Sequence, residues 1–63
     1  MERLDAFEKM LADLQAQAAY EAEQMEKLKT AGKEKSATYR QFFGNRLVYM
    51  RIFDTYREYG LLD

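Results

Sequence analysis

Apolar residues recur through the first half of the chain at alternating intervals of three and four positions. The series comprises Leu4, Phe7, Leu11, Leu14, Ala18, Met25 and Leu28, and Glu21 is its single polar member. This spacing is the a/d pattern of a heptad repeat, and it predicts an amphipathic helix over about residues 2–30. Gly32 stands where a left-handed glycine ends many helices, so a polar turn is expected over residues 31–38.

A second helical pattern follows this turn and is apolar around most of its circumference. Thr38 and Gln41 match the capping box, in which two side chains bond reciprocally to backbone amides, so the helix is expected to start at Tyr39. It is expected to end at Tyr59, because Gly60 suits the position after a helix end. Its apolar members are Phe42, Phe43, Leu47, Tyr49, Met50, Ile52, Phe53, Tyr56 and Tyr59. The fold class predicted is all-α, an antiparallel two-helix hairpin in one domain spanning residues 1–63.

A short turn places the two helices side by side, with Thr30 and Tyr39 flanking the connection. The predicted pairs are Met25 and Leu28 with Phe42 and Phe43, Leu14 with Tyr56, and Phe7 and Leu11 with Leu61 and Leu62; small alanines face Leu47, Met50 and Phe53. In this register Phe43 and Met50 point at the first helix. Tyr49, Tyr56 and their neighbours are then turned largely aside.

Such an aromatic surface on so small a chain predicts self-association. A chain of this size buries only about 60% of its unfolded surface, and without cysteine or histidine it has no disulfide or imidazole–metal site to reinforce it. We expect a two-fold homodimer of hairpins forming a four-helix bundle. The alternatives are a larger oligomer, a longer coiled coil, a complex with a different protein, and a monomer. The expected interface comprises Leu4, Phe7, Leu11, Tyr49, Ile52, Phe53, Tyr56 and Tyr59.

Glu21 interrupts the apolar series and allows two interpretations. As a buried acid it would need hydrogen-bond partners or a shifted pKa. In the interpretation that we favour from sequence, helix drift brings Ala22 into the seam and Glu21 moves aside to pair with Arg46.

Catalysis is not expected from this set of residues. The chain has no histidine, so a nucleophilic hydroxyl would have no imidazole base. For the same reason the chain lacks the Glu-x-x-His motif of di-metal sites in helical bundles. No metal or cofactor is therefore predicted, and the protein is expected to act by association with itself or another protein.

Basic residues around the turn support a second hypothesis, binding of nucleic acid. Lys29, Lys33, Lys35 and Arg40 could contact phosphates, beside a second helix rich in Arg and Tyr. The net charge of −1 and pI near 5.4 count against a dedicated nucleic-acid protein. The N-terminal residues lead into no apolar run, and the longest such run is far too short to span a bilayer, so we expect a cytoplasmic protein without membrane segments.

Overall fold

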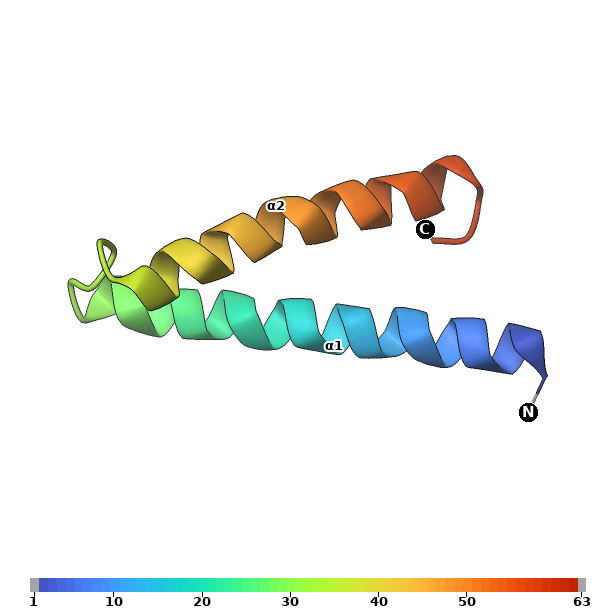
Figure 1. Ribbon diagram of the computed structural model, residues 1–63, viewed down its shortest axis with the longest axis horizontal. Coiled ribbons are helices and arrows are strands. Elements are labelled where there is room, and N and C mark those ends of the chain that lie inside the picture. Colours follow the sequence, from blue (N-terminus) through green and yellow to red (C-terminus); the bar gives the residue numbers. More distant parts are fainter. Residues whose placement is uncertain (1, 63) are drawn as a thin grey trace.

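A computed structural model, which describes residues 2–62, confirms the all-α hairpin (Figure 1). Helix α1 spans Arg3–Thr30 and helix α2 spans Ala37–Glu58. The two helices run antiparallel and are joined by one short turn. Met1 and Asp63, the ends of the expected domain, lie outside the described residues.

Both helices end in the same glycine motif, as the sequence predicts for Gly32 and Gly60. Gly32 has a φ of 72° and Gly60 a φ of 73°, in the left-handed region that suits glycine. After α1, the amide of Lys33 donates to the carbonyl of Leu28 at 2.8 Å. After α2, the amide of Leu61 donates to the carbonyl of Tyr56 at the same distance. This Schellman arrangement satisfies carbonyls that a helix end otherwise leaves free.

The start of α2 differs from the expectation at Tyr39. The N-cap is Ser36, whose Oγ accepts a hydrogen bond of 3.2 Å from the amide of Tyr39, and the helix begins at Ala37. Ser36 has the extended backbone of an N-cap, with φ −68° and ψ 154°. Thr38 therefore lies inside the first turn, so the capping box predicted for Thr38 and Gln41 is wrong. A serine two residues earlier provides the same hydroxyl acceptor.

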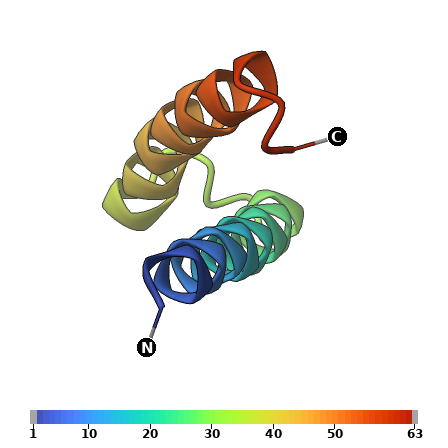
Figure 2. The same ribbon diagram turned by 90° about the vertical axis from the view of Figure 1, so that its right-hand side faces the viewer.

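The helices lie close together beside the turn and diverge towards their free ends (Figure 1). Viewed along the hairpin, residues 2–62 form one pair of helices and no further layer (Figure 2). The molecule measures 44 × 24 × 17 Å, and its longest dimension matches the length of α1. Among residues 2–62, neither helix is long and apolar enough to cross a membrane.

The seam of α1 follows the predicted heptad series. Leu11, Glu21 and Met25 are buried, and the half-buried residues of the series are Phe7, Leu14, Ala18 and Leu28. Leu4 is the exception, at 64% exposed, because α1 is longer than α2 and its first turns overhang.

The rotation of α2 differs from the prediction. The side chains of Tyr49, Phe53 and Tyr56 are largely covered by the hairpin. Those of Phe43 and Met50 are more open to solvent, at 48% and 51% exposed. The expectation that Phe43 points at α1 is therefore wrong, whereas Met50 still lines the space between the helices opposite the alanines of α1. Because apolar residues cover well over half of the circumference of α2, hydrophobicity leaves more than one rotation open, and hydrogen bonds to Glu21 can select among them.

The contact at the open end involves a pair of rings that the predicted register did not name. The Tyr56 ring packs edge-on against the Phe7 ring with centroids 5.5 Å apart. Where the helix axes diverge, two aromatic rings together span a gap that a leucine would leave open.

Candidate protein-interaction site

Glu21 is the centre of a hydrogen-bond cluster that joins the two helices. Its side chain is buried, and its Oε2 accepts from Gln17 Nε2 at 2.8 Å and from the Tyr49 hydroxyl at 2.9 Å. Its Oε1 accepts from Asn45 Nδ2 at 3.0 Å. Asn45 and Tyr49 are one helical turn apart on α2, so both reach the same carboxylate. The predicted ion pair with Arg46 is wrong, because neutral donors already satisfy both oxygens.

These hydrogen bonds determine the charge state of the cluster. The hydrogen bond from Gln17 is the main cause that lowers the pKa of Glu21 below its ordinary value, and it outweighs the opposing effect of burial; Asn45 and Tyr49 lower it further. Burial, followed by the neighbouring carboxylate, raises the pKa of the Tyr49 hydroxyl. At neutral pH Glu21 is thus an anion and Tyr49 a neutral donor.

This cluster fixes the register of the hairpin. A shift of one turn between the helices would leave a buried carboxylate without the two donors of α2, which is strongly unfavourable. Within the described part of the chain, no buried side-chain nitrogen or oxygen lacks a partner, so the cluster is complete as it stands. Its geometry is that of a structural element, because both carboxylate oxygens already accept hydrogen bonds from within the hairpin.

A groove of about 450 Å³ runs between the helices beside this cluster. Ala18, Ala19 and Ala22 of α1 form one side, because their small side chains leave space. The larger side chains along the groove are Met25, Phe42, Arg46, Tyr49, Met50 and Phe53.

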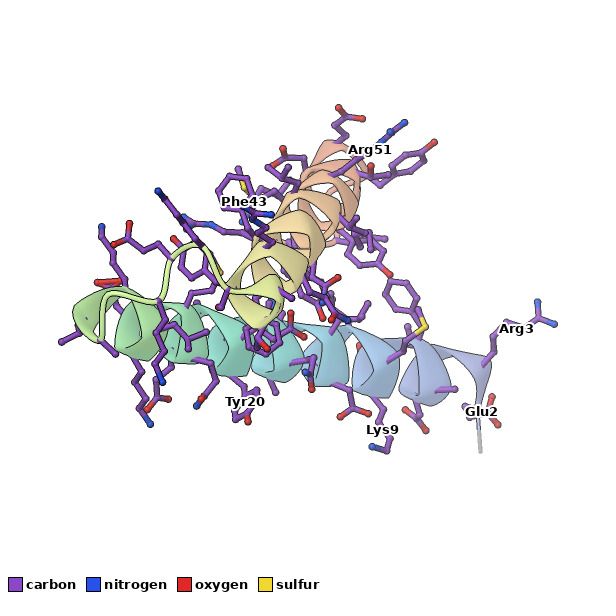
Figure 3. The ribbon with its side chains drawn as sticks, turned by 60° about the vertical axis from the view of Figure 1, so that its left-hand side comes forward. Glu2, Arg3, Lys9, Tyr20, Phe43 and Arg51 are labelled. Atoms are coloured by element: carbon purple, nitrogen blue, oxygen red, sulfur yellow. The ribbon has the colours of Figure 1, made fainter. Side chains whose placement is uncertain are left out.

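Helix α2 carries an exposed apolar surface that the hairpin leaves uncovered. We call it the α2 outer patch, and it consists of Phe43, Leu47, Val48 and Met50, which are 48%, 54%, 57% and 51% exposed. Met50 lies at the edge of the patch, because it also lines the groove between the helices. Phe43 and Arg51 project from the side of α2 away from α1 (Figure 3). No residue of α2 is buried, although α2 supplies the side chains that cover α1. The apolar seam of α1 is therefore covered by α2, whereas part of the apolar surface of α2 remains exposed to solvent.

The predicted interface residues fall into two groups. Phe7, Leu11, Tyr49, Phe53 and Tyr56 lie on the seam within the hairpin, where Tyr49 bonds to Glu21 and its ring stacks on Phe53 at 6.3 Å. Leu4 and Tyr59 are largely exposed and Ile52 is half-buried. Sequence reasoning missed the α2 outer patch, because the predicted rotation had placed Phe43, Leu47 and Met50 against α1.

The predicted anion-binding residues gather at the turn end of the molecule. Lys29 ends α1, Lys33 and Lys35 lie in the turn, and Arg40 is in the first turns of α2. All four are exposed, and none of the ion pairs formed among residues 2–62 involves them.

The acidic residues of the hairpin do not converge. Across residues 2–62 no group of three or more Asp or Glu side chains is placed to hold a metal ion. Comparisons of the chain with protein-family models, with curated proteins and with solved structures returned no match.

Proposed function

We propose that this chain is a non-catalytic helical module that acts by helix-to-helix association, and that its first partner is a second copy of itself. Two hairpins pair through their α2 helices to form a four-helix bundle. A cytoplasmic setting belongs to the same proposal. The observation that carries it is the α2 outer patch, on a helix that has no buried residue of its own.

The accessible surface of the hairpin supports association. A folded monomer of 7.5 kDa is expected to expose about 4,200 Å². The hairpin exposes 5252 Å², an excess of about 1,000 Å². A standard protein interface covers about 800 Å² on each partner. The excess on one chain is thus of the size that a stable dimer covers.

The shape leads to the same conclusion. The radius of gyration is 14.1 Å, whereas a compact chain of this length would have about 11 Å. One layer of two helices cannot enclose a core, and the lowest exposures among its apolar side chains are 5% for Met25 and 9% for Leu11. A second hairpin laid on the first would supply the missing layer.

Solution mass tests this proposal. Light scattering on a size-exclusion column should give twice the chain mass for the wild type. Leu47→Glu should give the monomer mass, because a carboxylate in a packed apolar contact is strongly unfavourable. Tyr20→Glu is the matched control, since Tyr20 is 55% exposed and lies on the side of α1 away from α2 (Figure 3). It should leave the mass unchanged. A wild-type monomer at every concentration would refute the proposal.

Nucleic-acid binding is the second candidate, favoured by the four exposed cations at the turn end. Lys29, Lys33, Lys35 and Arg40 have no internal acidic partner among the described residues and are free to contact phosphates. Titration with RNA and DNA should then show binding that weakens steeply as salt is added. Binding that persists after Lys33 and Lys35 are both changed to glutamine would count against this assignment.

A further inference from the structure

The side of α2 opposite the seam carries a regular row of residues, which we call the outward row. Its members, spaced by three or four positions along the helix, are Arg40, Gly44, Leu47 with Val48, Arg51, Thr55 and Glu58. All of them are exposed. The apolar pair Leu47 and Val48 occupies the centre, and charged residues occupy the ends. The row overlaps the α2 outer patch at this central pair.

Gly44 is the member of the outward row at which the fold of the hairpin does not require a glycine. Apart from its chain neighbours and the local helix backbone, a Cβ added at Gly44 would have no atom within 4 Å, and the φ of Gly44 is not in the left-handed region. Glycine inside a helix is less favourable than alanine by about 1 kcal/mol. Among residues 2–62, no close neighbour of Gly44 calls for a glycine at this position. Contact with an approaching side chain would account for it, because glycine leaves the backbone surface uncovered.

The row is symmetric about the middle of the helix. Helix α2 spans Ala37–Glu58, so its midpoint falls between Leu47 and Val48. An antiparallel second α2 centred there overlaps along its full length and places Leu47 of one copy against Val48 of the other. In the same register Gly44 lies opposite Arg51 of the other copy. The uncovered backbone at Gly44 then has room for the long arginine stem.

The charges of the row favour the antiparallel orientation. Arg40, near the N-terminal end of α2, comes to lie beside Asp54 and Glu58 of the other copy. A parallel pair would instead place Arg40, Arg51 and Glu58 each against its own equivalent, and like charges at such short range oppose association. Asp54 is bonded to Arg57 at 3.0 Å but keeps 69% of its side chain exposed, so a second cation can reach it.

We propose that two copies of α2 pair antiparallel along the outward row, on a two-fold axis between Leu47 and Val48, with Gly44 receiving Arg51 of the other copy. This arrangement rests on the proposed self-association and specifies its geometry. An isologous contact of this kind limits the assembly to two copies, because the outward row of each copy is covered by that of the other.

Disulfide trapping tests the register, because the chain contains no cysteine and single-cysteine variants are unambiguous. Leu47→Cys, next to the axis, should form a covalent dimer under mild oxidation, and Val48→Cys should do the same. Thr55→Cys is the matched control on the same row. Two copies of Thr55 would lie about 22 Å apart at 1.5 Å per residue, beyond the reach of a disulfide. Mixed Arg40→Cys and Thr55→Cys chains should form the heterodimer.

The outcomes separate the register from self-association itself. Efficient self-linking of Thr55→Cys would show a parallel pair and overturn the proposal. A dimeric mass under reducing conditions with no linking at Leu47→Cys or Val48→Cys would also overturn it and leave self-association intact. A monomeric wild type would refute the proposed function as a whole.

Gly44→Ala gives an independent test, because it should raise the stability of the isolated hairpin and weaken the dimer. The helix of an isolated hairpin should gain stability, because the added methyl has free space. If Arg51 of a second copy packs there, the dimer dissociation constant should rise at least about tenfold, as for an added carbon in a packed contact. Sedimentation over a dilution series would measure it. An unchanged or lower constant would show that Gly44 faces solvent in the dimer.

Discussion

At the scale of single residues, Glu21 shows how a charge is kept inside a narrow apolar seam. Its carboxylate receives three hydrogen bonds from uncharged donors, at 2.8, 2.9 and 3.0 Å. Such bonds to an anion are stronger than bonds between neutral groups. The two donors of α2 join the helices, and the donor of α1, Gln17, stands one turn before Glu21 and orients it. A leucine at this position would fill the seam but leave Asn45 and Tyr49 without their acceptor.

Glu21→Gln should destabilise the hairpin, because an amide cannot accept from all three donors and its own NH₂ would face one of them. We expect a loss of about 1–3 kcal/mol in the free energy of unfolding, which lowers Tm by about 4–8 °C per kcal/mol in a chain of this size. Thermal unfolding followed by circular dichroism measures it. The control is Glu23→Gln, which removes an exposed ion pair with Lys27 and should change stability by less than about 0.5 kcal/mol. Equal effects would contradict the structural role of Glu21.

The same cluster predicts how stability depends on pH. The folded state lowers the pKa of Glu21 below 4.5, so its contribution is complete above pH 4.5 and is lost as pH falls through the lowered value. The folded state raises the pKa of Tyr49 above 10.0, so its contribution is complete below pH 10.0 and is lost as pH rises through the raised value. Urea unfolding across both ranges should show these two declines. Glu21→Gln should reduce the acid decline and Tyr49→Phe should remove the alkaline one.

At the scale of the helices, the start of α2 depends on one hydroxyl. Ser36→Ala should cost about 1 kcal/mol, because the amide of Tyr39 loses its acceptor. Thr38→Ala is the matched control, since Thr38 lies inside the first turn and is exposed. It should be neutral or slightly stabilising, as alanine is the better helix former. Urea titration of both variants decides between the two caps. A larger loss for Thr38→Ala would restore the capping box predicted from sequence.

The two helices differ in how far their sequences predict their structure. In α1 a narrow apolar series faces one way, so periodicity alone identifies the seam from Phe7 to Leu28. In α2 apolar residues cover most of the circumference, and periodicity cannot distinguish Tyr49 and Tyr56 from Phe43 and Met50. The hydrogen bonds to Glu21 depend on the placement of residues from both helices, so no local pattern reveals them. The glycines that end the helices were predictable because their chemistry is local.

At the scale of the whole molecule, a single layer of two helices buries few of its apolar side chains. The helices diverge away from the turn, so their contact weakens towards the end where the Phe7 and Tyr56 rings meet (Figure 1). A second hairpin on α2 would bury Leu47 and Val48 of the α2 outer patch and hold α2 in place from its other side. In such an assembly folding and association are one equilibrium, as in dimers whose monomers are only marginally stable.

This coupling predicts that thermal stability rises with protein concentration. For a dimer that dissociates as it unfolds, each tenfold increase in concentration adds about 1.4 kcal/mol per dimer, and Tm increases accordingly. Calorimetry over a dilution series should show this increase for the wild type. Leu47→Glu should unfold at a lower Tm that does not change with concentration, because its outer patch can no longer pair. Tyr20→Glu should behave as the wild type does. A wild-type Tm that is the same at all concentrations would mean that the hairpin folds alone, and the stabilising contacts would then have to lie within α1 and α2 themselves.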